Sequence, residues 1–439
     1  MARHSGEGVA VRWRAGVRTI LHPVVSRSGR LSSLLGGGGS IAVAMGVMNV
    51  ATYGFTMIAA RLLGPPAYGA LAGLMATLLV ITVLQLGLQA TAARRISADP
   101  DHVAQIEGTI LGVTWRAALA LAVVLLALSP VLDALLRLDS LPTAALVAVA
   151  SIPFTVMGGQ AGILQGERRW WELSVLYVLS GVPRLVIGTA LILWQPTETS
   201  ALIGTAIGAV APVVAGWWFL RRERDPGVSS ETHRFRSVMV EIFRNSQVLL
   251  AFFVLSNVDV IVARNVLPEH DAGLYAGGLI LTKAVLFLPQ FVVVVAFPSM
   301  STIGERRQAL TLSLGLVAGI GAAVTLGAAL FPGLALVFVG GADYTEISDN
   351  LAVFAVLGTV LSMLQLLVYA VLARQAHRSV LLVWLALVVL VCLGLLTTTF
   401  EQLLTVVIVV DAALFAVLLV LSLRTTQIAT VEPPLDPAA

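Results

Sequence analysis

Charged residues and cysteine are scarce in this chain. Only 12% of its 439 residues are charged, against about 25% in an ordinary soluble domain. The single cysteine, Cys392, excludes an intrachain disulfide framework and a cysteine-rich metal site. Only one of the 27 basic residues, Lys283, is a lysine. Hydrophobic residues make up 58% of the chain and gather in long runs, which predicts an all-α polytopic membrane protein.

The sequence also lacks the motifs by which many enzymes are recognised. It contains no HExxH, no Walker phosphate loop, no GxSxG and no cluster of metal-ligating residues. The six histidines lie apart from one another in the expected tails and loops. We therefore expect neither an enzyme nor a bound metal or cofactor.

About twelve apolar stretches are long enough to cross a bilayer, for which a helix needs about 20 residues. The polar segment 221–242 divides them into two equal sets. The predicted stretches are 39–60, 68–92, 107–130, 141–163, 172–194, 201–220, 243–263, 273–297, 309–331, 349–372, 379–398 and 402–423. The expected organisation is an arginine-rich tail over 1–38, a six-helix bundle over 39–220, a linker over 221–242, a second six-helix bundle over 243–424 and a tail over 425–439.

The distribution of basic residues predicts the orientation in the membrane. Cytoplasmic segments carry an excess of arginine and lysine. If both termini are cytoplasmic, the arginines outside the membrane divide 21 to 3, and the three on the far side are Arg61, Arg137 and Arg264. Tryptophan pairs beside arginine pairs, as at Trp170 and Trp171, are typical of interfacial anchors. We therefore expect contact with membrane lipids and no binding of nucleic acid.

A motif in the first half of the chain returns about 200 residues later. Ala-Arg-Leu-Leu-Gly-Pro begins at Ala60, Ala-Arg-Asn-Val-Leu-Pro begins at Ala263, and a Gly- and Ala-rich helix follows each. Chance recurrence is the alternative, but each copy lies between the first and second predicted helices of its half. Because each half has an even number of helices, both enter the membrane from the same side. We expect a pseudo-two-fold axis along the membrane normal, with a central cavity between the bundles.

Five segments of the sequence together resemble one known family. They are Ala60–Gly69 and Gln85–Leu88 in the first half, and Asn257–Val262, Ala272–Tyr275 and Phe297–Pro298 in the second. Their order and spacing resemble the polysaccharide transporter family, the O-antigen and exopolysaccharide flippases of the multidrug/oligosaccharidyl-lipid/polysaccharide exporter superfamily.

The resemblance implies two helical bundles that work by alternating access in the bacterial cytoplasmic membrane. The implied cargo is a polyprenyl-diphosphate-linked oligosaccharide, a precursor of cell-surface polysaccharide. A polysaccharide polymerase or glycosyltransferases are the implied protein partners. About twelve helices fit the fourteen-helix murein-precursor flippases of the superfamily less well.

Three cations lie within the apolar stretches: Arg116, Arg184 and Lys283. A charge at the centre of a bilayer costs about 2.5–3.5 kcal/mol on insertion scales, so such residues usually face protein, water or an anionic ligand. The implied diphosphate suits them, because a guanidinium donates two parallel hydrogen bonds to phosphate. Arg184 is the strongest candidate, since it lies near mid-depth and directly follows Pro183. The alternatives are ion pairs that only hold helices together and, for Arg116, extension toward the lipid head groups.

The acidic and polar residues within the apolar stretches are secondary candidates. Asp259 and Asp411 could bind a coupling proton or Na⁺, or could neutralise one of the cations. Polar side chains of the first two helices could line the cavity and hydrogen-bond sugar hydroxyls, or could bond neighbouring helices to one another. These residues are Asn49, Thr52, Tyr53, Thr56, Gln85 and Gln89.

The sequence thus favours a lipid-linked oligosaccharide flippase. An ion-coupled drug or metabolite antiporter of the same superfamily is the nearest alternative, although the first predicted helix lacks the acidic residue that multidrug members often carry there. A membrane scaffold that recruits cell-wall enzymes without transporting anything is the alternative from a different class.

Overall fold

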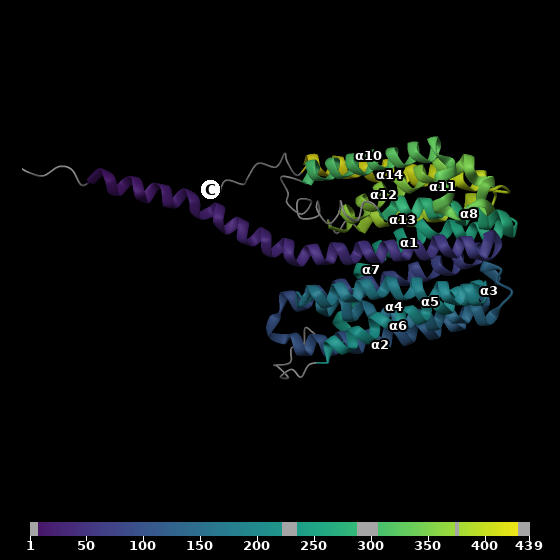
Figure 1. The fold of residues 1–439 in the computed structure, drawn as a ribbon, viewed down its shortest axis with the longest axis horizontal. Helices are drawn as coiled ribbons and strands as arrows, with labels where there is room; N and C mark the ends of the chain where they lie inside the picture. Colours follow the sequence, from purple (N-terminus) through teal and green to yellow (C-terminus); the bar gives the residue numbers. More distant parts are fainter. Residues whose placement is uncertain (1–7, 222–234, 288–305, 374–376, 429–439) are drawn as a thin grey trace, which may run out of the picture.

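The computed structural model describes residues 8–221, 235–287, 306–373 and 377–428. These residues form α-helices and short 3₁₀ turns without a β-strand, which confirms the all-α prediction (Figure 1). Nine of the described helices are long and apolar enough to cross a membrane. The end of the predicted stretch 273–297, with Phe297–Pro298, lies outside the described residues, as do most of the linker and the last residues of the C-terminal tail.

The first bundle begins with one long helix that reverses direction. Helix α1, Gly8–Ala98, contains the first two predicted spans and turns at Gly64, whose φ of 70° and ψ of 172° are not helical. Glycine adopts a positive φ without the steric cost that a side chain adds, and Pro65 and Pro66 follow directly. The rest of the bundle is α2 (Val103–Ala127), the short α3 (Ser129–Leu136), α4 (Leu141–Gly166), α5 (Trp170–Trp194) and α6 (Glu198–Leu220).

Local sequence explains where several of these helices start. Prolines stand in the first positions of α3 and α4, where a missing backbone N–H costs nothing. Thr197 caps α6, because its hydroxyl oxygen accepts the backbone N–H of Ser200 at 3.2 Å. Within the bundle, Gly158 and Gly162 of α4 lie against the backbone of α1, where a side chain would collide. Small residues of this kind let membrane helices approach closely.

The second bundle repeats the plan of the first. It consists of α7 (Phe235–Val266), α8 (Glu269–Phe287), α10 (Arg306–Leu330), the short α11 (Pro332–Val339), the 3₁₀ segment η3 (Ala342–Asn350), α12 (Leu351–Ala373), α13 (His377–Gly394) and α14 (Phe400–Ile428). Each bundle has a short helix directly after its third predicted span: α3 follows α2 in the first bundle, and α11 follows α10 in the second. Both short helices lie at the end of the molecule that carries the Gly64 turn, opposite the two termini (Figure 1).

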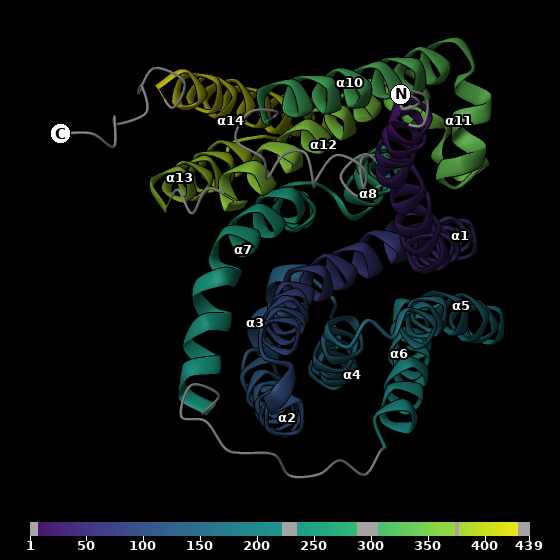
Figure 2. The ribbon, with the colours of Figure 1, turned by 90° about the vertical axis from the view of Figure 1, so that its left-hand side faces the viewer.

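The two bundles meet along α1, α7 and α8. Viewed from the end near the termini, α8 and α10–α14 form one group and α2–α6 the other, with α1 and α7 between them (Figure 2). A buried apolar cluster joins the bundles at the Gly64 end, where Phe55 and Tyr68 of α1 pack with Leu274 of α8 and Tyr344 of η3. This arrangement confirms the predicted pair of helical bundles.

Helix α7 starts within the predicted linker and belongs to both bundles. Its first turns contribute Val238 and Ile242 to the apolar core of the first bundle, beside Leu88 and Ile106. From Ala251 onward, the same helix packs in the core of the second bundle. The passage from one bundle to the other therefore takes place within a continuous helix.

Candidate substrate-binding cavity

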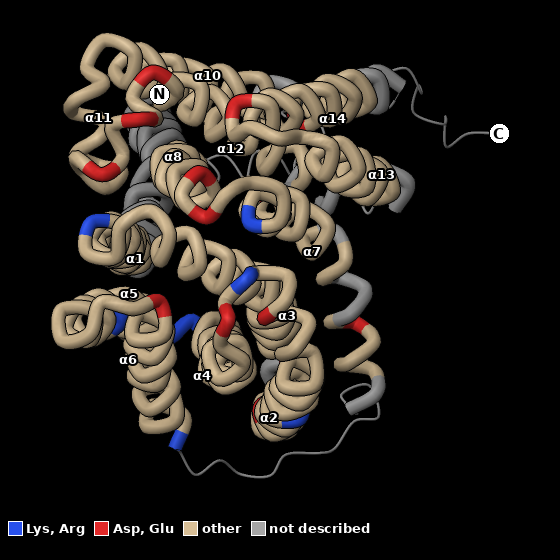
Figure 3. Tube along the Cα trace, turned by 90° about the vertical axis from the view of Figure 1, so that its right-hand side faces the viewer, with Lys and Arg blue, Asp and Glu red and all other residues tan. Residues whose placement is uncertain are grey.

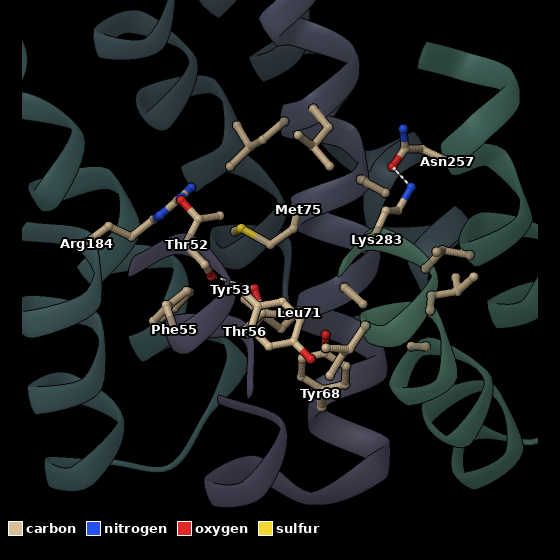
Figure 4. A pocket seen from close by; sticks show the side chains of 18 of the residues that line it. Thr52, Tyr53, Phe55, Thr56, Tyr68, Leu71, Met75, Arg184, Asn257 and Lys283 are labelled. Carbon is tan, nitrogen blue, oxygen red and sulfur yellow. Dashed lines mark hydrogen bonds between the residues drawn. The ribbon is translucent and has the colours of Figure 1, made fainter. Parts of the chain in front are cut away.

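A cavity of about 150 Å³ lies between the bundles. By the same measure one water needs about 10–15 Å³, so the space holds a phosphate-sized group and some water but not an oligosaccharide. Its walls come from α1, α4, α5, α7 and α8. Figure 4 shows side chains that line it. The polar and charged lining residues are Thr52, Tyr53, Thr56, Tyr68, Thr82, Arg184, Asn257 and Lys283. Apolar side chains such as Leu71, Met75 and Phe154 supply most of the remaining surface.

Arg184 reaches the cavity from the first bundle. It lies on α5 directly after Pro183, and Gly208 of α6 packs against its backbone. One terminal nitrogen of its guanidinium donates a hydrogen bond to the hydroxyl of Thr52 on α1 (Figure 4). Its Nε is buried and has no hydrogen-bond partner among the described residues. The guanidinium therefore keeps donor capacity for an anion.

Lys283 reaches the same cavity from the second bundle. Its Nζ donates to the backbone oxygen of Ser256 at 2.6 Å and to Oδ1 of Asn257 at 2.9 Å, both on α7. Figure 4 shows Lys283 with Asn257 on one side of the cavity and Arg184 with Thr52 on the other. Both cations are thus hydrogen-bonded to neutral oxygens, and the structure brings together two of the three cations that the sequence analysis named.

Two buried carboxylates lie behind Lys283. Asp259 of α7 is 2% exposed and accepts the hydroxyl of Tyr275 at 3.0 Å and the backbone N–H of Val260 at 2.9 Å. Asp411 of α14 is 1% exposed, and its two oxygens have no hydrogen-bond partner in the described part of the chain. Lys283 interacts electrostatically with both acids. Asp259 and Asp411 are therefore close to the cavity without being part of its described lining.

Arg116 is not brought to this cavity. It lies on α2 at the outer flank of the first bundle, where its side chain is exposed, and it is absent from the described lining of the cavity. The structure therefore does not bring it together with Arg184 and Lys283. The helix turns this residue away from the bundle interface, in line with the alternative that it extends toward lipid head groups.

The polar residues predicted to line the cavity divide into two groups. Tyr53 does line it, and its hydroxyl donates to the backbone oxygen of Phe338 in α11 at 3.0 Å. Gln85 and Gln89 instead face the interior of the first bundle. Gln85 donates to the sulfur of Met157 at 3.7 Å, while Gln89 donates to Gln165 and Tyr177, each at 2.8 Å. Asn49 is half-buried on α1 and is not among the described lining residues.

The sequence analysis missed several residues of the cavity. Asn257 was noted only as part of a family-like segment, yet it holds Lys283 in place. Tyr68 was likewise noted only as part of such a segment, and Met75 and Phe154 were not singled out at all, although all three line the space. Asn257 could have been found, since it lies in an apolar stretch where an amide needs a partner. The apolar side chains carried no comparable signal.

A comparison with protein families decides the class of this chain. The family model described as "Polysaccharide biosynthesis protein" matches residues 34–304, which is more than half of the chain. The chain belongs to the polysaccharide biosynthesis protein family. No curated protein sequence matches this family member.

Solved structures show the same fold. An inward-facing multidrug resistance MATE family transporter of the MOP superfamily has a TM-score of 0.70 at 15% identity, over 89% of this chain and 96% of its own. The eukaryotic MATE transporter AtDTX14 gives 0.63 at 13% identity, over 89% and 98%. A MOP superfamily transporter from Pyrococcus furiosus gives 0.64 at 15% identity, over 90% and 96%. This polysaccharide biosynthesis family member therefore has a MATE-like fold, built from helices long and apolar enough to cross a membrane several times.

Proposed function

We propose that the chain is a flippase that moves a polyprenyl-diphosphate-linked oligosaccharide across the bacterial cytoplasmic membrane by alternating access. Membership of the polysaccharide biosynthesis family and the MATE-like fold support the transporter class. The 21 to 3 division of arginines supports an orientation with both termini in the cytoplasm.

One observation carries the choice of cargo. Arg184 from the first bundle and Lys283 from the second face one cavity, and each is hydrogen-bonded to neutral oxygens. A diphosphate carries more than one negative charge and many acceptor oxygens, so it satisfies both cations at once. Removing those charges from water is costly, and fixed cations in the cavity offset that cost.

The remaining walls suit a cargo with apolar and polar parts. Leu71, Met75 and Leu279 offer apolar surface next to the two cations. The tyrosine and threonine hydroxyls of α1 offer donors and acceptors for sugar hydroxyl groups. Because the cavity in this state holds only a phosphate-sized group, passage of the glycan requires the bundles to move apart on one side.

We also propose that Asp259 and Asp411 form the place where a coupling proton or Na⁺ binds. With both carboxylates ionised, they and Lys283 carry a net charge of −1, so one bound cation makes the cluster neutral. The two acids lie close enough to Lys283 to interact with it electrostatically. An ion bound there would therefore change the electrostatic potential in the cavity. If the two acids served only to balance the charge of Lys283, replacing them would leave the response of transport to an ion gradient unchanged.

The proposal is tested by transport and by bound lipid. Arg184→Gln and Lys283→Gln, alone and together, are reconstituted in vesicles with a fluorescent polyprenyl-diphosphate-linked oligosaccharide. Arg116→Gln is the matched control, because it removes an intramembrane arginine that does not reach the cavity. We expect each cavity variant to lower the flipping rate at least about tenfold, in line with the loss of one charge-assisted hydrogen bond, and the control to remain near wild type.

Mass spectrometry of lipid that copurifies with the protein separates the alternatives. A bound polyprenyl-diphosphate glycan that is lost in the double variant supports the flippase. Efflux of an organic cation, without bound glycan lipid, would identify the drug antiporter instead. Bound glycan lipid with no transport by the wild type would indicate the scaffold. Full flipping activity in the double variant would reject the role of the two cations.

A further inference from the structure

Two arginines at equivalent positions of the sequence repeat join the bundles at the Gly64 end. Arg61 follows Ala60 in the first half, and Arg264 follows Ala263 in the second. The sequence analysis used both as markers of orientation and as part of the repeated motif, and gave neither a role in contacts between the bundles. In the structure each of them contacts a short helix of the opposite bundle, so the repeat is also a repeat of contacts.

The contact made by Arg264 runs from the second bundle to the first. Its Nε donates to the backbone oxygen of Leu136 at 2.8 Å, and a terminal nitrogen donates to the backbone oxygen of Arg137 at 2.7 Å. The neighbouring Asn265 donates from its amide to the backbone oxygen of Leu135 at 2.7 Å. In the opposite direction, a terminal nitrogen of Arg137 donates to the backbone oxygen of Asn265 at 2.5 Å. Arg264 is only 3% exposed, and its bond to Leu136 is buried, whereas the bonds made by Asn265 and Arg137 are exposed.

The contact made by Arg61 runs the other way. A terminal nitrogen of Arg61 donates to the backbone oxygen of Val337 in α11 at 2.5 Å. On the same helix α1, Tyr53 donates to the backbone oxygen of Phe338, while Tyr344 of η3 donates back to the backbone oxygen of Ala60 at 3.3 Å. Figure 3 shows this end of the molecule, with α11 near α1 and α3 near α7.

The chemistry of the two contacts is the same. The acceptors Leu135, Leu136, Val337 and Phe338 lie in the last turns of α3 and α11. The last carbonyl groups of a helix lack partners within the helix, and they form the negative end of its dipole. A guanidinium from the opposite bundle donates to Leu136 and to Val337 and adds a favourable charge interaction. The amide of Asn265 and the hydroxyl of Tyr53 donate to the neighbouring carbonyls of Leu135 and Phe338. Each arginine thus caps the C-terminus of a helix that belongs to the other bundle.

Between the two caps the backbones of the bundles touch. Gly69 of α1 and Gly273 of α8 approach so closely that a side chain on either would meet the backbone of the other helix. The rings of Tyr68 and Tyr344 form an edge contact with centroids 6.4 Å apart. The apolar cluster that joins the bundles surrounds this point. The cavity with Arg184 and Lys283 is therefore covered at this end by two polar caps and an apolar seal.

We propose that Arg61 and Arg264 form a reciprocal gate that closes the cavity at the Gly64 end. Opening at this end breaks both caps, because the donor and the acceptor of each belong to different bundles. In the predicted orientation this is the extracytoplasmic gate. The proposal does not depend on the identity of the cargo, since it concerns only the contacts between bundles.

The test measures the distance between the bundles directly. Spin labels are placed at Ala134→Cys in α3 and Asp343→Cys in η3, both exposed, in a chain that also carries Cys392→Ser. Electron–electron distances are then recorded without substrate in lipid nanodiscs. We expect the parent chain to give one short distance. Arg61→Ala with Arg264→Ala should raise the longer-distance population at least about tenfold, as the loss of charged hydrogen bonds implies.

Arg169→Ala is the matched control. Arg169 also donates to a carbonyl in the last turn of a helix, the backbone oxygen of Phe219 in α6 at 3.0 Å, but both partners lie in the first bundle. It should leave the label distance unchanged. The single variant Arg61→Ala removes an exposed side chain and guards against misfolding, and it should give a smaller shift in the same direction. An unchanged distance distribution in the monodisperse double variant, or an equal shift in Arg169→Ala, would overturn the gate.

Discussion

Oδ1 of Asn257 lies 2.9 Å from Nζ of Lys283, and this amide is one of the two neutral partners of the only lysine in the chain. The substitution Asn257→Asp places a carboxylate at that position with almost no change in shape. Opposite charges 4 Å apart interact by about 4 kcal/mol at an effective dielectric constant of 20, so the lysine would be neutralised by the protein. We expect binding of the diphosphate lipid to fall at least about tenfold, measured as copurifying lipid and as flipping rate. Asn257→Ala, which adds no charge, should cost less; equal losses in the two variants would contradict this view of the site.

Thr52 holds the guanidinium of Arg184 at the cavity wall. Thr52→Val keeps the shape of the side chain and removes the acceptor oxygen. A hydrogen bond to a charged group contributes about 1.5–3 kcal/mol, and cavity water replaces part of it. We therefore expect the flipping rate to fall roughly three- to tenfold, by an increase in the apparent KM for the lipid. Thr52→Ser retains the hydroxyl and should stay near wild type, whereas a wild-type rate in Thr52→Val would show that the contact does not position Arg184.

Asp411 carries two buried oxygens that have no hydrogen-bond partner among the described residues. Asp411→Asn removes the ionisable group but preserves its size. If the acid binds the coupling ion, transport by this variant should lose its response to an imposed proton or Na⁺ gradient while downhill lipid exchange continues. Glu401→Gln, an exposed carboxylate in the first turn of the same helix, is the control and should keep the response. A gradient response that persists in Asp411→Asn would leave the acid with a purely structural role.

Gly64 is the point where α1 reverses, with a φ of 70° and open space around the position of a Cβ atom. Gly64→Ala therefore tests backbone strain without a steric clash. A positive φ with ψ near 180° is a region essentially restricted to glycine and costs another residue about 1–3 kcal/mol, so we expect the free energy of unfolding in detergent to fall by about that amount. Gly46→Ala is the counterpart, because Gly46 is helical and also has open space around it. It should stabilise the protein by about 0.5–1 kcal/mol, and a destabilisation equal to that of Gly64→Ala would contradict the assignment.

Much of this architecture could be predicted from composition and pattern. Runs of apolar residues located the long helices, and the repeated Ala-Arg motif indicated two similar halves. Arg184 and Lys283 were found because a cation inside an apolar run is costly wherever it faces lipid, so its presence there points to a polar surrounding.

It was much harder to predict which side of each helix faces the lipid and which faces the protein interior. Arg116 and Arg184 look alike in the sequence, but one is exposed on α2 and the other lines the cavity. Lipid and protein interior are both apolar, so a membrane helix shows little periodicity that distinguishes the two sides. For the same reason the sequence left two roles open for the glutamines of α1, and the structure shows the bonds between helices. The roles of Arg61 and Arg264 depend on contacts between residues more than 120 apart, which no local pattern reveals.

The course of α7 limits how the molecule can change shape. Val238 and Ile242 are fixed in the core of one half, while the helix from Ala251 onward is embedded in the other. The halves are therefore not joined by a flexible linker alone. Because one continuous helix packs in both cores, a tilt of one half against the other requires α7 to bend or unwind. If the two halves tilt against each other as the proposed function requires, α7 would be strained by the tilt, and that strain would favour return to the straight helix.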